Sequence, residues 1–333
     1  MWEQSFYFFS LNLFMVDILG IGEVAKDWVA IIDHFPAPDE KVDSSEQQMF
    51  AGGVTANFCV AAARLGVSTG FVGAVGDDPE GKFLLDDFKS ENVDTTVCLR
   101  KEGCKSAVNF IFVVSTTGEK TIIQSPYMQS TKLTVEDIQA NRKYFESAKL
   151  LHTTCIHPDI TLEAMKIVKA AGGKISMDLE SQIASRGMDK FEEVFKYVDI
   201  LLPNKMGAMA LMKTETPEEA ARKFLDLGIK MVVLTKGSEG AMTIEKSGDG
   251  YKEHSVPAFK ISPVDTTGAG DTFCATFLSS HVIKGKSIES SLKIANAAAG
   301  LKCLKLGART GMPNENQLTE FMKQHGIDYN SLK

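Results

Sequence analysis

The chain from residue 134 onward alternates short apolar runs with longer helix-like stretches, and this alternation limits the possible folds more than any other feature. Helices of about ten or more residues between short apolar strands indicate right-handed strand–helix–strand units, which build a parallel sheet. We therefore predict an α/β fold with a central, mostly parallel sheet. The sequence predicts helices over residues 134–146, 159–171 and 189–197, and strands over residues 149–154, 174–178, 199–202 and 230–235.

The first part of the chain begins the same sheet and then supplies a second group of strands. Residues 16–22 form a short apolar run that ends in glycine, as expected for a buried parallel strand. Asp27 follows this run, near the edge at which open α/β sheets bind ligands. Further strands are predicted over residues 28–33, 41–50, 95–99, 107–114 and 120–124.

Size and charge restrict the class of ligand. A chain of 333 residues could hold two average domains, but α/β folds of this length are often single domains. The formal net charge of -7 gives no basic face for nucleic acid or for an anionic membrane, so we expect a small-molecule substrate and neither of those partners. The six cysteines contain no Cys-x-x-Cys pair, which indicates reduced core thiols and a cytoplasmic protein.

The start of the chain does not follow this plan. Residues 6–14 are apolar, but they lack a basic start and a small-residue cleavage site, and they are short for a membrane span. We predict that residues 1–14 are an N-terminal extension and that a single domain occupies residues 15–333.

Residues 264–273, Val-Asp-Thr-Thr-Gly-Ala-Gly-Asp-Thr-Phe, predict a binding site for a phosphate. The segment turns through Gly268, Ala269 and Gly270 into a helix. The N-terminus of a helix carries unpaired N–H groups and about half a positive charge. Glycines permit positive φ angles and let the backbone approach a ligand closely. We expect these three residues to form an anion hole.

Asp271 follows this loop, and a carboxylate beside a phosphate site needs a chemical reason. It would accept the proton of an attacking hydroxyl group in phosphoryl transfer, while fixed donors neutralise the charge of the transferred group. The alternative is structural: Asp271 is the N-cap of the helix, and the glycines only make a tight turn. Taken alone, so short a motif favours the cap by roughly two to one.

Two separate signatures reverse this preference. Asp-Thr-Thr-Gly-Ala-Gly-Asp-Thr-Phe resembles the C-terminal signature of the ribokinase-like (PfkB) carbohydrate kinases, and Ala-Gly-Gly-Val-Thr-Ala-Asn at residues 51–57 resembles their N-terminal signature. The resemblance runs over residues 17–313, nearly the whole chain. It implies a three-layer α/β/α fold with a small β-sheet lid over the sugar, drawn here from residues 28–50 and 95–125. It also implies a homodimer formed through the lid.

The resemblance implies roles for individual residues. Asp27, Gly53 and Asn57 would bind the hydroxyl groups of a sugar, and Asp271 would deprotonate a primary hydroxyl group. Val54 departs from the lysine that ribokinases proper tend to have at this position. The residues implied to contact ATP are Asn204, Thr235, Gly237, Gly240 and Asn296.

The same resemblance implies ATP, Mg²⁺ and K⁺ as cofactors. In the family a glutamate that helps to place the metal and the phosphates lies three residues after the position of Asn204, where this chain has Gly207. A monovalent-cation site for K⁺ is implied at Asp265, Thr267, Gly307 and Gly311.

The leading hypothesis is an ATP-dependent kinase that phosphorylates a hydroxymethyl group of a small sugar or sugar derivative. A nucleoside kinase of the adenosine type is the alternative within the same fold, since Phe50, Phe110 and Phe112 are available in the lid to surround a base. A sugar-binding regulator without catalysis is the alternative from another class. The intact Asp271 opposes that alternative, and Gly207 favours it weakly.

Overall fold

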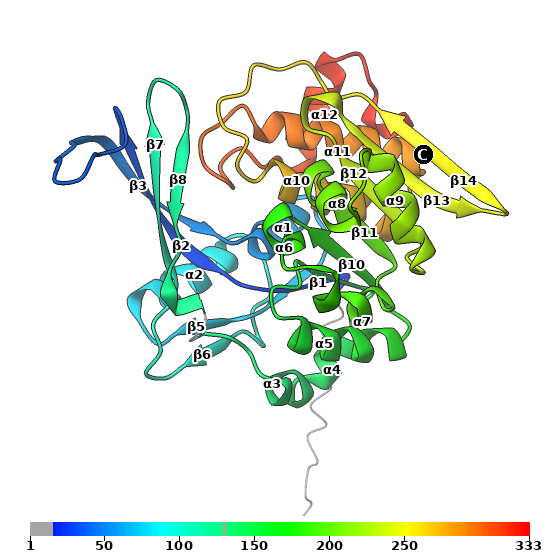
Figure 1. Cartoon of the computed structure of the whole chain (residues 1–333), viewed down its shortest axis with the longest axis horizontal. Coiled ribbons are helices and arrows are strands. Elements are labelled where there is room, and N and C mark those ends of the chain that lie inside the picture. The colour runs from blue at the N-terminus through cyan, green and yellow to red at the C-terminus, as the bar shows by residue number, and fades with distance from the viewer. Residues whose placement is uncertain (1–15, 129–130) are drawn as a thin grey trace, which may run out of the picture.

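The computed structural model describes residues 16–128 and 131–333, so the predicted extension over residues 1–14 lies outside the described residues. An eight-stranded sheet forms the centre of the molecule (Figure 1). The strands from β12 to β4 are parallel, whereas β13 and β14 form an antiparallel hairpin at one edge. In spatial order the sheet contains β14 (Gly250–Val256), β13 (Ala241–Ser247), β12 (Met231–Thr235), β11 (Ile200–Pro203), β10 (Lys174–Leu179), β9 (Leu150–Thr153), β1 (Ile18–Ile21) and β4 (Thr69–Val72).

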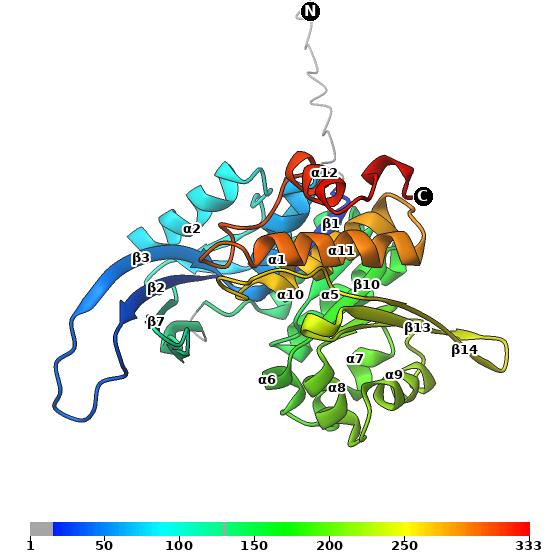
Figure 2. The ribbon, with the colours of Figure 1, turned by 90° about the horizontal axis from the view of Figure 1, so that it is seen from above.

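Helices cover both faces of this sheet, as Figure 2 shows from above. One face packs against α1 (Val54–Arg64), α2 (Pro79–Ser90), α10 (Ala269–Leu278) and α11 (Ile288–Lys302), with α12 (Glu315–Gln324) on the outside of α11. The other face packs against α3 (Val135–Ala140), α4 (Arg142–Glu146), α5 (Pro158–Ala170), α6 (Ser181–Ala184), α7 (Glu192–Phe195), α8 (Lys205–Met212) and α9 (Pro217–Asp226). Among the described residues, no helix combines the length and apolar character needed to cross a membrane.

A second, four-stranded sheet projects from the body beside α2, and we call it the lid (Figures 1 and 2). Its strands in order are β3 (Ser44–Gly52), β2 (Ala25–Ile32), β7 (Val108–Val114) and β8 (Lys120–Ile123). The predicted strands at 28–33, 41–50, 107–114 and 120–124 therefore belong to one sheet. Large apolar side chains remain exposed on it, at Met49, Phe110, Ile122 and Ile123. Pairing of the lid with a second copy stays a prediction.

The predicted strand over residues 95–99 does not join the lid. The strand forms later, as β6 (Leu99–Lys101), and it pairs with β5 (Ala74–Gly76) in a separate two-stranded sheet. The cause lies at Asp94, whose N–H donates to the Thr69 carbonyl oxygen (2.9 Å) and whose carbonyl oxygen accepts from the Phe71 N–H (2.8 Å). These bonds hold the segment against the edge of the central sheet.

Two predicted helices are shorter than expected. The helix over 134–146 is interrupted at Asn141, whose Nδ2 donates to the Asp137 carbonyl oxygen (2.9 Å) and so ends α3 before α4 begins. In place of the predicted helix over 189–197 the structure has a 3₁₀ turn followed by the short helix α7. The sequence did not predict α6. Short 3₁₀ turns also lie at Pro126–Met128, Gly237–Glu239 and Tyr329–Ser331, and α10 continues into a π-helical segment at Ser279–Ile283.

Candidate active site

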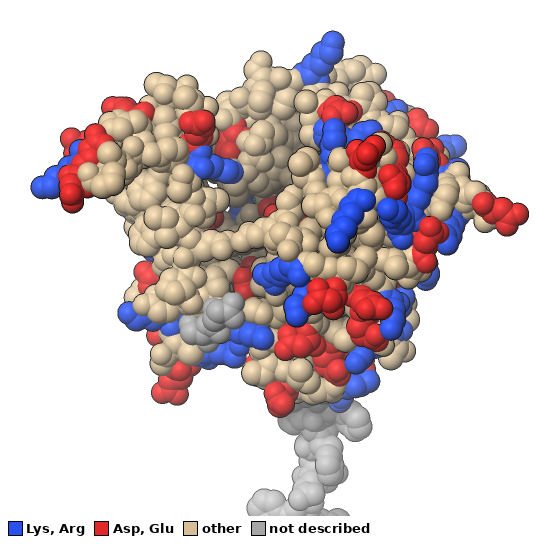
Figure 3. All heavy atoms as spheres, viewed as in Figure 1, with Lys and Arg blue, Asp and Glu red and all other residues tan. Residues whose placement is uncertain are grey.

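The predicted site residues gather where the lid meets the N-terminus of α10. A space-filling view shows the surface hollowed between the lid and the body (Figure 3). Lys120 of β8 reaches across from the lid, and its Nζ donates to the Thr267 hydroxyl oxygen (2.8 Å) in the loop before α10. The lid is therefore in direct contact with the loop that leads into the predicted anion hole.

The loop before α10 has the shape that the glycines predict. Gly268 is the N-cap residue and has a φ of 80°, and a Cβ atom there would lie 2.4 Å from the Ala308 carbonyl oxygen. The Ala269 N–H donates to the Thr266 carbonyl oxygen (3.1 Å) inside the turn. Gly270 is exposed, and a Cβ atom there would meet nothing within 4 Å. The first turn of α10 therefore faces open space at Gly270.

Asp271 is the third residue of α10, and the interpretation of Asp271 as the N-cap is wrong because Gly268 occupies that position. The Asp271 side chain is buried, with 8% of its surface exposed, and Oδ2 accepts a hydrogen bond from Asn57 Nδ2 (2.8 Å). Burial raises the pKa of Asp271 to about 7; the Asn57 hydrogen bond and the positive charge of Arg309 oppose this rise, and the negative charge of Glu180 adds to it.

Asn57 lies in the first turns of α1, which packs against α10. Both ends of its side-chain amide have protein partners: Nδ2 donates to Asp271, and Oδ1 accepts from Arg309 Nε (2.8 Å). Asn57 was predicted to bind the sugar. The structure places it between a buried arginine and the carboxylate proposed to do the chemistry, and direct contact with a sugar stays a prediction.

Asp27 lies in β2 of the lid rather than in a loop. Its Oδ1 accepts a hydrogen bond from Asn109 Nδ2 (2.9 Å) on the adjacent strand β7. Burial raises the pKa of Asp27, and the Asn109 hydrogen bond opposes that rise. A Cβ atom on Gly52 would lie 2.0 Å from Asp27 Oδ2, and one on Gly53 would lie 2.5 Å from the Glu23 carbonyl oxygen. The paired glycines therefore let β3 and α1 approach Asp27 and its strand.

Asn204 and Thr235, predicted at ATP, end the neighbouring strands β11 and β12 and form a backbone bridge. Asn204 is the N-cap of α8, and its Oδ1 accepts from the Gly207 N–H (2.6 Å) and from the Ser181 hydroxyl (2.9 Å). A Cβ atom on Gly207 would lie 3.0 Å from the same oxygen. A glutamate at this position would therefore require its neighbours to move.

The other residues predicted at ATP have structural partners of their own. Gly237 and Gly240 bound the turn after β12 with φ angles of 59° and 102°. A Cβ atom on Gly240 would lie 2.1 Å from the Val256 carbonyl oxygen. Asn296 is buried in α11, and its Nδ2 donates to the carbonyl oxygens of Val256 (3.0 Å) and Pro257 (3.1 Å). These bonds tie α11 to the end of β14, and contact of these residues with a nucleotide stays a prediction.

The residues predicted to bind K⁺ lie beside a buried ammonium group of the chain. The Lys302 side chain is 0% exposed, and its Nζ donates to the Asp265 carbonyl oxygen (2.8 Å) and lies 3.8 Å from Asp265 Oδ2. Oδ1 of Asp265 accepts from the N–H and hydroxyl of Thr267, and Oδ2 accepts from the Gly307 N–H. Burial raises the pKa of Asp265, but these bonds and the Lys302 charge outweigh it and lower the pKa. A Cβ atom on Gly311 would clash with the Lys302 carbonyl oxygen.

Sequence reasoning assigned no role to Lys302, Arg309, Lys120 or Asn109. The sequence does contain a pattern that indicates burial of Lys302. Lys302 shares one face of α11 with the small, buried residues Ala295 and Ala298, and a lysine buried on such a face needs a partner for its charge. No comparable pattern marks the direction in which Arg309 points from its loop.

Comparison with known proteins places the chain in a family. The family model described as pfkB family carbohydrate kinase matches residues 15–315. An uncharacterized sugar kinase of Archaeoglobus fulgidus is 36% identical over 256 residues, which are 75% of this chain and 97% of that protein. An ATP-dependent ribose-1-phosphate kinase of Halopiger xanaduensis is 28% identical over 310 residues, which are 93% of this chain and 99% of that protein.

The similarity extends to solved structures. A structure of Arabidopsis thaliana ribokinase complexed with ribose and ATP matches with a TM-score of 0.79 and 26% identity, over 92% of this chain and 99% of that one. This match confirms the predicted ribokinase-like fold, with its central sheet, its helices on both faces and its smaller sheet. The chain therefore belongs to the pfkB family of carbohydrate kinases, and it is a sugar kinase.

Proposed function

We propose that the enzyme transfers the γ-phosphate of ATP to a hydroxymethyl group of a small sugar or sugar derivative, with Asp271 as the general base. The observation that carries the proposal is the buried Asp271 carboxylate, held by Asn57 and next to the open first turn of α10. A general base is most effective when its pKa lies near the working pH, and burial brings the pKa of Asp271 to about 7. The ribose and ATP in the Arabidopsis thaliana complex support this pair of substrates.

In this proposal Asp271 takes the proton of the acceptor hydroxyl as its oxygen bonds to the terminal phosphorus. The bond between that phosphorus and the bridging oxygen breaks, and ADP leaves with the electron pair. The Gly270 N–H and the dipole of α10 would neutralise negative charge on the group in transfer, while the Ala269 N–H stays bonded to the Thr266 carbonyl oxygen. Gly270 leaves the approach to this turn free of a side chain, whereas Gly268 lets the turn pack against the Ala308 backbone.

The carboxylates around Asp271 fit the Mg²⁺ that ATP-dependent transfer implies. Within the described residues, no three His, Cys, Asp or Glu side chains are arranged to hold a metal ion by themselves. Mg²⁺ is usually bound by one or two carboxylates together with phosphates and water. Glu180 lies close enough to Asp178 and Asp271 to raise the pKa of both, and it would hold the ion where Gly207 provides no carboxylate. When bound, Mg²⁺ would neutralise charge on the phosphate oxygens.

Asp27 and Lys120 indicate how the lid would take part. Asp27 would bind sugar hydroxyl groups from β2, while Lys120 connects β8 to the loop before α10 through Thr267. A lid that closes over the acceptor would exclude water from the γ-phosphate, so ATP would be consumed by transfer to the acceptor rather than by hydrolysis.

Release of ADP from ATP is therefore expected to be slow without an acceptor and to rise strongly with a suitable sugar. The measurement is ADP release with ribose, ribose 1-phosphate, other sugars and nucleosides, with each product tested for covalent phosphate. A deoxy analogue that lacks the reacting hydroxyl group is the matched control, and it should not stimulate ADP release. Equal rates with every compound would contradict the proposal. Faster turnover with nucleosides would favour the nucleoside kinase instead.

The response to K⁺ tests whether Lys302 replaces a bound ion. The family resemblance implies K⁺ at Asp265, but the Lys302 ammonium already supplies a buried positive charge there. We expect equal rates in K⁺ and in tetramethylammonium at the same ionic strength. Lys302→Ala should become dependent on K⁺, since the charge at Asp265 would then need another partner. Activation of the unaltered enzyme by K⁺ would show that Lys302 does not replace the ion.

A further inference from the structure

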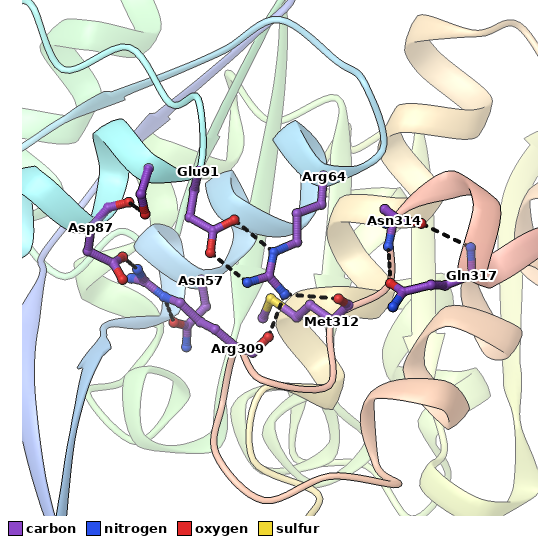
Figure 4. Close-up of polar contacts among 9 residues, drawn as sticks. Asn57, Arg64, Asp87, Glu91, Arg309, Met312, Asn314 and Gln317 are labelled. Atoms are coloured by element: carbon purple, nitrogen blue, oxygen red, sulfur yellow. Dashed lines mark hydrogen bonds and ion pairs between the residues drawn. The ribbon is translucent and has the colours of Figure 1, made fainter.

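Arg309 is a buried arginine that is joined to the proposed base through one side chain, Asn57. It lies in the loop between α11 and α12, and 7% of it is exposed. Figure 4 shows its guanidinium group between Asp87 of α2, with which it forms an ion pair, and Asn57 of α1. The guanidinium group also lies over the ring of Phe88, at 5.4 Å from the ring centre.

The bond from Arg309 to Asn57 decides which way the amide of Asn57 faces. A side-chain amide has a hydrogen-bond acceptor at one end and donors at the other, and the two orientations have nearly the same shape. Arginine has donors only, so Nε of Arg309 selects the orientation in which it meets Oδ1 (2.8 Å). Nδ2 of Asn57 then points to Asp271 Oδ2 (2.8 Å). The reverse orientation would put an amide oxygen against a carboxylate.

We propose that Arg309 is a positioning residue for phosphoryl transfer: it holds the Asn57 amide in the orientation that donates to Asp271, and so keeps the base both oriented and ionised. The inference rests on the proposed role of Asp271. Arg309 acts through Asn57 and is not itself placed at the substrate.

The charges around Asp271 make this contact important. Loss of the Arg309 charge or of the hydrogen bond from Asn57 would favour the protonated form of Asp271. Protonated Asp271 cannot accept the proton of a hydroxyl group. The Arg309 charge acts on Asp271 directly as well as through Asn57. The titratable groups that face Asp271 are Asp178 and Glu180 at the end of β10, Cys274 on α10, Lys302 on α11 and Arg309 itself.

The test is the pH dependence of kcat in Arg309→Met. We expect the low-pH fall of kcat, the acid limb of the profile, to move to higher pH, so that the rate at pH 6 falls about tenfold or more beyond the loss at pH 9. At pH 9 only the lower plateau caused by the lost bond to Asn57 should remain. Arg309→Lys keeps the charge and should leave the acid limb near that of the unaltered enzyme, with a lower plateau from the loss of the bond to Asn57. Equal losses at every pH in Arg309→Met would overturn the proposal.

Arg64 provides a matched control. It is a second arginine of the same network, pairs with Glu91, and donates to the carbonyl oxygens of Arg309 (2.7 Å) and Met312 (2.9 Å), but it does not contact Asn57 (Figure 4). Arg64→Met should loosen the same loop and lower the melting temperature without moving the acid limb. A shift equal to that of Arg309→Met would mean that loosening of the loop explains the effect.

Arg309→Met leaves the Asp87 carboxylate without its partner, which can impair folding. The double variant Arg309→Met with Asp87→Leu removes both charges, a change that is often neutral for stability, and it should show the same acid-limb shift.

A mutant cycle with Asn57→Ala tests whether Arg309 acts on Asp271 through Asn57. If Arg309 acts through Asn57, the plateau rate of the combined variant should match that of Asn57→Ala alone, and additive losses would overturn that route. Normal turnover in Asp271→Asn would refute the base itself, a separate result.

Discussion

Asp271→Asn is expected to lower the rate of phosphoryl transfer by about 10²- to 10⁴-fold, the usual contribution of a general base. Asparagine keeps the shape of the side chain, and its Oδ1 can still accept from Asn57 Nδ2, so the local hydrogen bond survives. What the variant loses is the ability to take a proton. Affinity for ATP should stay the same or tighten, because the substitution removes a negative charge beside the phosphate site.

The same variant has an expected effect on stability that a structural role would not produce. The pKa of Asp271 rises from its ordinary 3.8 to about 7 on folding, mainly through burial. Protonated Asp271 therefore contributes stability that is present below pH 3.8 and is lost as the pH rises through about 7. Asp271→Asn avoids that loss, so it should be more stable than the unaltered protein at pH 8, by an amount on the order of 1–4 kcal/mol, and nearly equal at pH 4.

Single-turnover transfer, calorimetric ATP binding and melting curves at several pH values measure these effects. Asp265→Asn is not a suitable control because that side chain holds the loop before α10, whereas exposed Asp249 offers a neutral one. Near-normal turnover in folded Asp271→Asn would remove the catalytic role. A large rate loss together with a gain in stability at pH 8 would separate catalysis from folding.

The fold could be predicted because strands and helices carry local signals. The runs that form β9, β10 and β11 were located to within one or two residues by apolar character alone. The predictions of strands and helices failed where contacts outside the local sequence pattern determine the structure. Residues 95–99 look like a strand, but the backbone of Asp94 is bound to β4, and the helix over 134–146 is broken by a side-chain bond that apolar spacing does not reveal.

The candidate site shows the same division. The two signatures predict roles for Asp271, Asn57 and the glycines, because short motifs select residue types at fixed spacings. They did not show which residues meet. Asn57 and Asp271 are 214 positions apart, and Asn57 and Arg309 are 252 apart. The orientation of the Asn57 amide depends on both contacts at once, so it could be read only from the folded chain.

Lys302 illustrates a further limit. A family resemblance implies what relatives bind, and here it implies K⁺ at Asp265. The chain places a fully buried ammonium at that carboxylate and its carbonyl oxygen. A buried lysine is stable only where its charge is paired. Asp265 provides that pairing for Lys302. This pairing joins the C-terminal end of α11 to the loop before α10, and local patterns in either segment do not show it.

Asp27→Ala is expected to lower kcat/KM for the acceptor by about 10- to 10²-fold, and to leave the KM for ATP unchanged. A hydrogen bond to a charged group contributes about 1.5–3 kcal/mol, and the Asp27 carboxylate is proposed to accept such bonds from sugar hydroxyl groups. One oxygen is already oriented by Asn109 Nδ2 (2.9 Å), which leaves Oδ2, beside Gly52, available to a ligand. Asp27→Asn should show a smaller loss because its amide can still pair with a hydroxyl group.

The control is Asp33→Ala, which removes the same side chain just past the end of β2, at an exposed position. It should leave the kinetics unaltered, so that any effect at Asp27 cannot be a general response of the lid to losing an acid. The measurement is initial-rate kinetics with acceptor and ATP varied in turn. If Asp27→Ala changed the KM for ATP as much as the KM for the acceptor, Asp27 would be supporting closure of the lid rather than holding the sugar. Equal kinetics in Asp27→Ala and the unaltered enzyme would exclude both roles.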